Sequence, residues 1–172
     1  MKQHIVLVGL PGSGKTTVGK LAAESLRGAF VDIDTLILRK QGKPIAMIFA
    51  ELGEAVFRDM ERQEMESALG AEPAVIAPGG GWAAQPGALD AARPRGFIVY
   101  LKARPDTAAA RAATPGNRPT LMGEDPVARM KELLKEREPF YLKADAQVDA
   151  ERKTAAQVVE DVVALARTRA GW

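Results

Sequence analysis

The chain has 172 residues, of which 47% are hydrophobic and 27% are charged, and this is the composition of one ordinary globular domain. Cysteine is absent, which excludes a disulfide scaffold, a thiolate zinc site and a cysteine nucleophile. The single histidine argues against a histidine-rich metal site or a Ser-His-Asp triad. The net charge of +2 gives no indication of nucleic-acid binding.

Neither a membrane-spanning nor a secreted chain is expected. No apolar run approaches the roughly 18 residues that a membrane helix needs. The first four residues lead into a strand-like run without a cleavable signal pattern. We therefore expect a cytoplasmic, soluble protein with one domain over residues 1–172, which binds small molecules and neither nucleic acid nor membrane. A monomer is the expected oligomeric state.

Short apolar runs alternate with helical patterns along the chain. Strands are expected at 5–8, 29–31, 74–77, 96–101 and 146–149. Helices are expected at 15–26, at 35–70 in pieces broken near 42–44 and 53, at 105–112, at 126–141 and at 154–169. This alternation predicts an α/β fold whose parallel sheet carries helices on both faces, in three layers. Ligands bind such sheets beyond the carboxyl ends of the strands, where the glycine-rich and acidic segments of this sequence fall.

A phosphate-binding loop stands between the first expected strand and the first expected helix. Gly9–Thr16 matches G-x-x-x-x-G-K-[ST] at every fixed position. Its glycines let backbone N–H groups turn inward around a phosphate, beside the positive end of the helix dipole. Lys15, expected to be exposed without ligand, can reach the β- and γ-phosphates of ATP, and Thr16 can ligate Mg²⁺. Nucleotide contacts are expected from Gly12, Ser13, Gly14, Lys15, Thr16 and Thr17.

Two aspartates are the candidates for a magnesium-organising carboxylate. The sequence lacks the D-x-x-G and N-K-x-D segments of switch GTPases, and the strand at 74–77 ends in Pro78 instead of an acidic residue. Asp32 and Asp34 follow the second strand, and their side chains can project the same way if that strand continues. Alternatively, Asp34 caps the helix that follows.

The motifs between about residues 5 and 160 together resemble shikimate kinase. The resemblance is carried by the phosphate-binding loop, Asp32-x-Asp34, Phe57-Arg58 with Glu61, Gly79-Gly80-Gly81, Arg118-Pro119, and Arg137 with Tyr141. It implies a five-stranded parallel sheet of the nucleoside-monophosphate-kinase (P-loop kinase) type. It also implies MgATP-dependent phosphorylation of the 3-hydroxyl of shikimate.

Shikimate carries a carboxylate and three hydroxyls, and the candidate residues suit these groups. Arg58 and Arg137 can bind the carboxylate bidentately, unless each only pairs with neighbouring glutamates. Asp34 can hold the attacking hydroxyl and accept its proton. Three successive glycines can offer backbone N–H groups to the acceptor, unless they form only a tight turn. Contacts to the acceptor are expected from Asp34, Arg58, Gly79, Gly80, Gly81 and Arg137.

A lid is expected at about 113–125 and a substrate-binding helical segment at about 34–70. Arg118 in the lid would reach the transferring phosphoryl group, which gives a catalytic set of Lys15, Asp34 and Arg118. Thr16 and Asp32 are the expected metal ligands. Arg111 matches a position that stacks on adenine in the family, although a surface role fits it as well.

Departures from the family pattern occur at Leu38, Pro78, Trp82 and Thr120. Trp82 is close enough to Gly80 to reshape the acceptor pocket, and a kinase of gluconate or another polyol acid is the alternative if it excludes the shikimate ring. A nucleoside monophosphate kinase is disfavoured because the lid segment is too short for its insertion. A regulatory nucleotide-binding module is disfavoured because it needs no such set of acidic and basic residues.

Overall fold

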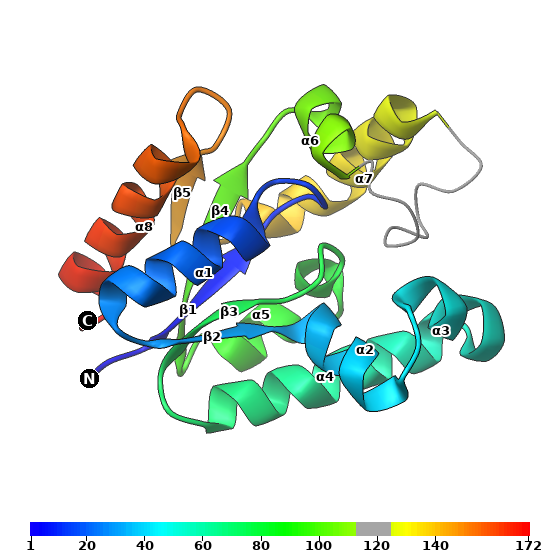
Figure 1. Ribbon diagram of the computed structural model, residues 1–172, viewed down its shortest axis with the longest axis horizontal. Helices are drawn as coiled ribbons and strands as arrows, with labels where there is room; N and C mark the ends of the chain where they lie inside the picture. The colour runs from blue at the N-terminus through cyan, green and yellow to red at the C-terminus, as the bar shows by residue number, and fades with distance from the viewer. Residues whose placement is uncertain (113–124) are drawn as a thin grey trace.

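Five parallel strands form one sheet in the computed structural model, which describes residues 1–112 and 125–172 (Figure 1). The strands are β1 (His4–Val8), β2 (Ala29–Asp32), β3 (Ala74–Ala77), β4 (Gly96–Lys102) and β5 (Ala146–Asp149). Their order in the sheet is β2-β3-β1-β4-β5, and each neighbouring pair is parallel. The expected three-layer α/β fold with a five-stranded parallel sheet is confirmed.

The expected helices are present with nearly the expected bounds. They are α1 (Lys15–Leu26), α2 (Ile33–Gln41), α3 (Ile45–Leu52), α4 (Glu54–Gly70), α6 (Pro105–Ala112), α7 (Pro126–Tyr141) and α8 (Ala155–Arg169). Two short elements are not expected from the sequence, the 3₁₀ helix η1 (Trp82–Ala84) and α5 (Ala88–Ala92). Both are too short to show a helical period. No helix among the described residues is long and apolar enough to span a membrane.

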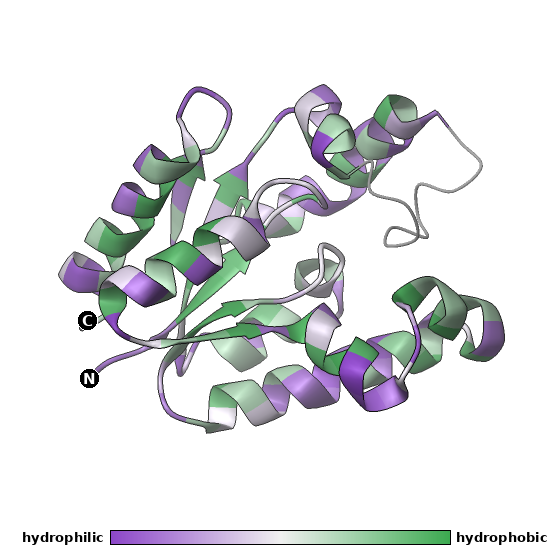
Figure 2. Cartoon of the chain, viewed as in Figure 1, coloured by the Kyte–Doolittle hydropathy of each residue, from purple (hydrophilic) through white to green (hydrophobic). Residues whose placement is uncertain are grey.

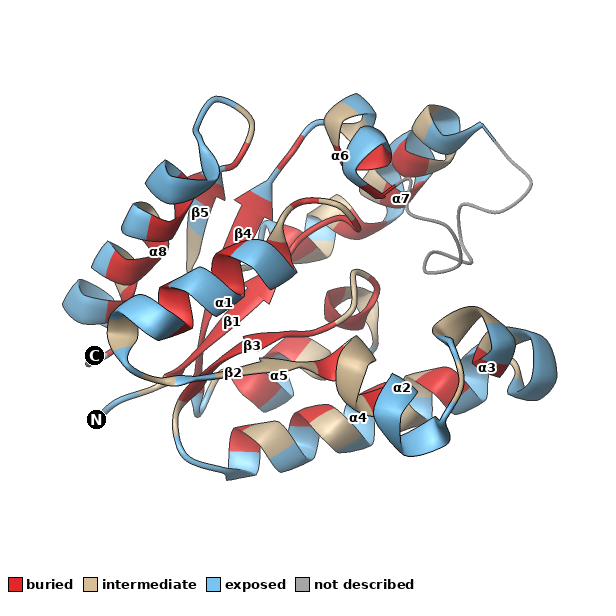
Figure 3. Ribbon diagram, viewed as in Figure 1, coloured by how far each residue is buried: buried red, intermediate tan, exposed pale blue. Residues whose placement is uncertain are grey.

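Helices cover both faces of the sheet, so the central strands are buried on both sides (Figure 3). Ile5 and Leu7 face α1 and α8, whereas Val6 and Val8 face the opposite core with α4 and α7. Successive strand residues alternate between faces, and a strand covered on both faces therefore reads as a continuous apolar run. Figure 2 shows this as hydrophobic strands beneath helices with mixed faces.

The chain turns toward opposite faces of the sheet after the neighbouring strands β1 and β3. After β1 it enters α1 in one core, and after β3 it enters η1 and α5 in the other. This divergence opens a crevice between the carboxyl ends of β1 and β3, where ligands bind in open α/β sheets. The phosphate-binding loop and Gly79–Gly81 lie on the two sides of that crevice.

The only histidine ties the sheet to α4. His4 is 1% exposed, its Nε2 lies 3.2 Å from the carbonyl of Leu69, and the N–H of Ala74 donates to its Nδ1 at 3.1 Å. These partners hold the neutral ring with its proton on Nε2. Burial lowers the pKa of His4, the nearby charge of Arg95 lowers it further, and the hydrogen bond to Leu69 opposes them.

We expect the free energy of unfolding to fall as the pH drops below about 6.5, the ordinary histidine pKa. The unfolded chain binds the proton more readily than the folded one, so the contribution is complete above that pH and is lost toward the lower folded-state pKa. Urea unfolding at pH 7.5 and pH 5.5 measures the loss, which is at most about 1.4 kcal/mol over this range, because pH 5.5 lies one unit below the unfolded-state pKa. His4→Val should have a lower free energy of unfolding than the wild type, but that free energy should change less between the two pH values. Equal pH responses in the two proteins would contradict this expectation.

Candidate active site

A cavity of about 330 Å³ opens at the carboxyl edge of the sheet and gathers most of the residues predicted to bind ligand. The predicted residues that line it are Gly12, Gly14, Lys15, Thr16, Thr17, Asp32, Asp34, Arg58, Gly79, Gly80, Gly81, Arg111 and Arg137. They come from the phosphate-binding loop and α1, from the junction of β2 and α2, and from α4, α6, α7 and the loop after β3. Segments that are far apart in the sequence therefore share one cavity.

Among the described residues, one predicted ligand residue, Ser13, does not line the cavity. Ser13 is buried, and its N–H donates to the carbonyl of Leu10 at 3.1 Å, which holds the loop in its turn. The role of Ser13 in binding nucleotide stays a prediction. Arg118 and Thr120, with most of the predicted lid at 113–125, lie outside the described residues.

The side chain of Lys15 is buried within the phosphate-binding loop. Gly12 and Gly14 have φ of +80° and +100°, which glycine adopts readily and other residues do not. The expectation that Lys15 is exposed is wrong: it is 9% exposed, and its Nζ donates to the carbonyls of Gly9 at 2.8 Å and Leu10 at 2.9 Å. A buried ammonium needs such hydrogen bonds to offset the loss of water.

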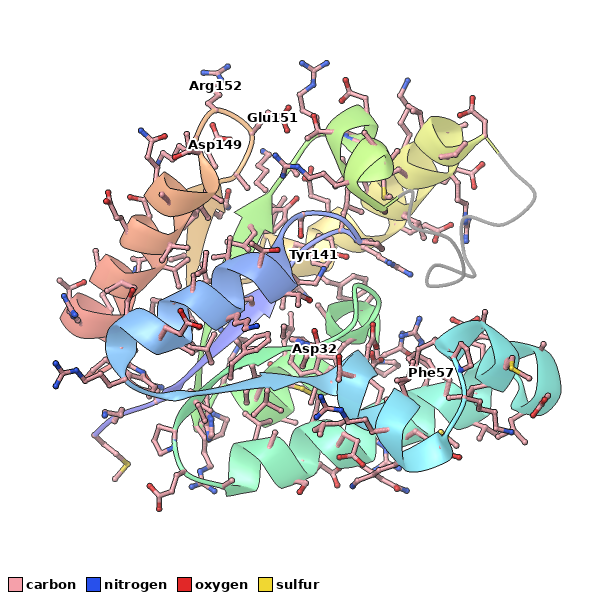
Figure 4. The ribbon with its side chains drawn as sticks, in the orientation of Figure 1. Asp32, Phe57, Tyr141, Asp149, Glu151 and Arg152 are labelled. Carbon is pink, nitrogen blue, oxygen red and sulfur yellow. The ribbon has the colours of Figure 1, made fainter. Side chains whose placement is uncertain are left out.

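Asp32 performs two tasks at the junction of β2 and α2 (Figure 4). One of its oxygens accepts the N–H of Thr35 at 3.1 Å and so caps α2, and the other accepts the hydroxyl of Thr16 at 2.8 Å. The alternative in which Asp34 caps this helix is therefore wrong. The strand also ends before Asp34, which lies in the first turn of α2 and still lines the cavity.

The hydroxyl of Thr16 and the carboxylate of Asp32 suit a magnesium ion. Mg²⁺ prefers oxygen ligands and is bound by one or two protein groups together with phosphate oxygens and water. The described residues contain no cluster of three or more His, Asp or Glu side chains that would form a metal site from protein alone. The two side chains therefore fit an ion shared with a nucleotide.

A second carboxylate, Glu61, approaches Asp34 across a glycine. Glu61 is fully buried on α4, and a Cβ added to Gly79 would lie 2.6 Å from its Oε2 and 3.1 Å from Oδ1 of Asp34. Burial raises the pKa of Glu61, the adjacent Arg58 opposes this, and the charge of Asp34 raises it further. Only glycine leaves room for both carboxylates at this point.

Two arginines from different helices line the acceptor side of the cavity. Arg58 on α4 donates to Glu61 at 2.8 Å and to Glu54 at 3.3 Å, so the predicted local ion pairs exist. The same guanidinium lies 2.5 Å from where a Cβ of Gly81 would be, so it also reaches the glycine loop. Arg137 on α7 is 8% exposed and belongs to no ion pair that we observe within the described residues.

An apolar wall completes the cavity and is not predicted from the sequence. It consists of Ile45, Phe49 and Phe57, and the two phenylalanine rings lie 4.9 Å apart at a tilt of 42°. Figure 4 shows Phe57 on α4 beside α3. In the sequence these residues look like ordinary members of amphipathic helices, and no spacing separates cavity residues from core residues. Phe57 and Glu61 belong to the motifs that carry the family resemblance, but a motif alone assigns neither of them a role.

Trp82 does not enter the cavity. Its side chain is 4% exposed and belongs to the apolar core, and the cavity lining ends at Gly81. A bulky residue after the glycines therefore does not exclude a cyclic acceptor. Pro78 lines the cavity, and Leu38 is an exposed side chain on α2.

The charge of the cavity favours anionic ligands. Its described lining contains the cations Lys15, Arg58, Arg111 and Arg137 and the carboxylates Asp32, Asp34 and Glu61. Arg111 is exposed at the end of α6, on the side of the phosphate-binding loop. Lys15 belongs to the phosphate-binding loop, and Arg111 to a helix that contacts that loop at Gly12. Arg58 and Arg137 instead lie against Gly80 and Gly81, so the cavity offers separate cations to a polyphosphate and to a small carboxylic acid.

Comparisons with known proteins agree with this geometry. The family model described as shikimate kinase matches residues 11–167. A shikimate kinase from Caldanaerobacter subterraneus is 42% identical over 161 residues, 94% of each chain. The structure of a shikimate kinase from Acinetobacter baumannii in complex with shikimate has a TM-score of 0.93 and 32% identity, and the match covers 100% of this chain and 97% of that one. A gluconokinase from Sinorhizobium meliloti is 19% identical with a TM-score of 0.66, over 98% of this chain and 94% of that one, and shares the fold alone. The chain belongs to the shikimate kinase family.

Proposed function

We propose that this protein transfers the γ-phosphoryl group of ATP to the 3-hydroxyl of shikimate and so forms 3-phosphoshikimate and ADP, a step of aromatic amino-acid biosynthesis. The observation that carries the proposal is the single cavity in which a phosphate-binding loop faces Asp34 and two arginines. We also propose that the protein acts in the cytoplasm as a monomer, in keeping with its composition and nearly balanced charge.

On the acceptor side, Arg58 and Arg137 bind the carboxylate of shikimate, and the backbone N–H groups of Gly79–Gly81 bind its hydroxyls. The apolar face of the ring lies against Phe49 and Phe57. Asp34 accepts the proton of the attacking hydroxyl, as a carboxylate beside the nucleophile does in kinases. Glu61 keeps Arg58 in place through the hydrogen bond at 2.8 Å.

On the nucleotide side, the phosphates lie against the backbone of Gly12–Thr17 and the Nζ of Lys15. Thr16 and Asp32 hold Mg²⁺, which neutralises charge on the phosphate oxygens when it is bound. Arg111 stacks on the adenine. Arg118 stabilises the charge on the transferring phosphoryl group, an assignment that rests on the sequence alone.

Coupled release of ADP tests the proposed reaction. The protein is assayed with ATP and Mg²⁺ against shikimate, gluconate and nucleoside monophosphates, and EDTA is the control for the metal. We expect turnover with shikimate only, and loss of turnover in EDTA. Turnover of gluconate without turnover of shikimate would reject shikimate as the acceptor but would still agree with an ATP-dependent kinase.

Arg58→Lys is expected to raise the KM for shikimate about tenfold and to change the KM for ATP less than about twofold. A lysine is a point charge and cannot reproduce the bidentate contact of a guanidinium with a carboxylate. Initial-rate kinetics with each substrate varied in turn measure both constants. Arg62→Lys is the matched control, because Arg62 lies one turn further along α4 and forms exposed ion pairs with Asp59 and Glu66. An unchanged KM for shikimate in Arg58→Lys would remove Arg58 from the acceptor site.

A further inference from the structure

Gly79–Gly81 form the glycine loop, and each of their three carbonyls accepts a hydrogen bond from the protein. The carbonyl of Gly79 accepts the N–H of Trp82 at 3.2 Å, and that of Gly81 accepts the side-chain amide of Gln85 at 3.0 Å. Both donors are close to their acceptors in the sequence. The carbonyl of Gly80 accepts the hydroxyl of Tyr141 at 2.5 Å, from a residue 61 positions later. With the carbonyls occupied, the loop offers its N–H groups to a ligand.

Tyr141 connects this loop to one of the two arginines. It is fully buried and lies one turn after Arg137 on α7, so the two side chains share a face of the helix. Burial raises the pKa of Tyr141 to about 12, while the nearby charge of Arg137 opposes the rise. The hydroxyl therefore stays protonated at neutral pH and donates to the carbonyl of Gly80.

The contact sets the direction of the peptide that follows Gly80. A trans peptide is planar and its C=O and N–H point in opposite directions, so holding the carbonyl of Gly80 on Tyr141 orients the N–H of Gly81 away from α7. The loop is also close to its neighbours: a Cβ added to Gly80 would lie 2.9 Å from Pro11 and 3.2 Å from Nη1 of Arg137. A rotation of the Gly80–Gly81 peptide would therefore shift the glycine loop relative to both the phosphate-binding loop and Arg137.

We propose that Tyr141 is a positioning residue for acceptor binding, because its hydroxyl fixes the Gly80–Gly81 peptide against the guanidinium of Arg137. This inference rests on the proposed function, since the acceptor whose binding it supports is shikimate. Tyr141 does not itself line the cavity. Its effect on the acceptor passes through Gly80 and Arg137.

The chain offers a matched control in Tyr100. Tyr100 on β4 is 1% exposed, and its hydroxyl donates to Glu138 at 2.8 Å. Its ring lies 5.1 Å from that of Tyr141, which Figure 4 labels, and it does not line the cavity. Tyr141→Phe and Tyr100→Phe each remove one buried hydroxyl and keep the ring. Only the first removes a contact with the glycine loop.

We expect Tyr141→Phe to raise the KM and the calorimetric Kd for shikimate about tenfold, which corresponds to about 1.4 kcal/mol and is of the size of one buried hydrogen bond. The KM for ATP should change less than about twofold, and Tyr100→Phe should leave both constants within about twofold of wild type while lowering the thermal midpoint. An unchanged constant for shikimate in Tyr141→Phe, or an equal rise in Tyr100→Phe, would overturn the proposal.

Amide hydrogen exchange at Gly81 provides a second measurement that does not depend on activity. With shikimate bound at saturation, we expect faster exchange at Gly81 in Tyr141→Phe than in Tyr100→Phe, and equal rates would overturn the proposal. The wild-type assay separates this inference from the proposed function. If the wild-type protein does not phosphorylate shikimate, the function fails, whereas a functional wild type with an unaffected Tyr141→Phe variant rejects only the role of Tyr141.

Discussion

Lys15→Ala is expected to lower kcat by at least about 10²–10³-fold, the usual cost of losing one preorganised group that stabilises charge in a transition state. The ammonium is held beside the phosphate-binding loop by the carbonyls of Gly9 and Leu10 at 2.8 and 2.9 Å. It is therefore already placed where the β- and γ-phosphates are expected, and alanine provides no charge there. Coupled ADP release at saturating ATP and shikimate measures the loss.

The burial of Lys15 adds a consequence for stability. The variant loses the donor to the two carbonyls, so its thermal midpoint should fall while the circular dichroism spectrum stays that of the folded protein. Lys20→Ala is the matched control, since Lys20 is an exposed lysine on the same helix. A folded Lys15→Ala protein with the kcat of the wild type would reject the nucleotide site at this loop.

Asp34→Asn is expected to lower kcat with shikimate about 100-fold or more and to leave ATP binding unchanged. The amide has nearly the shape of the carboxylate and can still hydrogen-bond the acceptor hydroxyl, but it cannot accept the proton. Because Asp32 caps α2, the helix keeps its cap in this variant. Steady-state kinetics and nucleotide-binding calorimetry together measure the two effects.

The structure provides a control for the loss of one acidic charge. Asp59→Asn changes an exposed aspartate on α4 whose one ion pair within residues 1–112 and 125–172 is with Arg62 at the surface, so it should keep the kcat of the wild type. If Asp34→Asn also had the kcat of the wild type, the role of Asp34 as the general base would be rejected. The charge of Asp34 contributes to the raised pKa of the buried Glu61, so the same variant should lower that pKa.

Most elements can be predicted from the sequence because their signals are local. Short apolar runs identify the strands, and the glycines and Pro44 near 42–53 identify the breaks between α2, α3 and α4. The elements η1 and α5 escape prediction, since three and five residues are too few to show a period. Helix α2 begins two residues earlier than the sequence pattern predicts, because Asp32 and not Asp34 is its capping residue.

Which residues share the cavity follows partly from the sequence as well. Parallel strands end at one edge of the sheet, so motifs after β1, β2 and β3 have to meet there. The identity of the wall residues does not follow. Phe49 and Phe57 meet only because α3 and α4 pack side by side, and the choice between cavity and core depends on that packing.

By itself, the sequence determined the phosphate-binding loop, the parallel α/β fold and the set of acidic and basic residues near the carboxyl edge. Only the tertiary structure decided that Lys15 is buried, that Trp82 turns into the core and that Tyr141 holds Gly80. The physical reason is the range of the interactions. Backbone propensities and apolar periods act within a few residues, whereas burial and hydrogen bonds between distant segments depend on how the helices lie on the sheet.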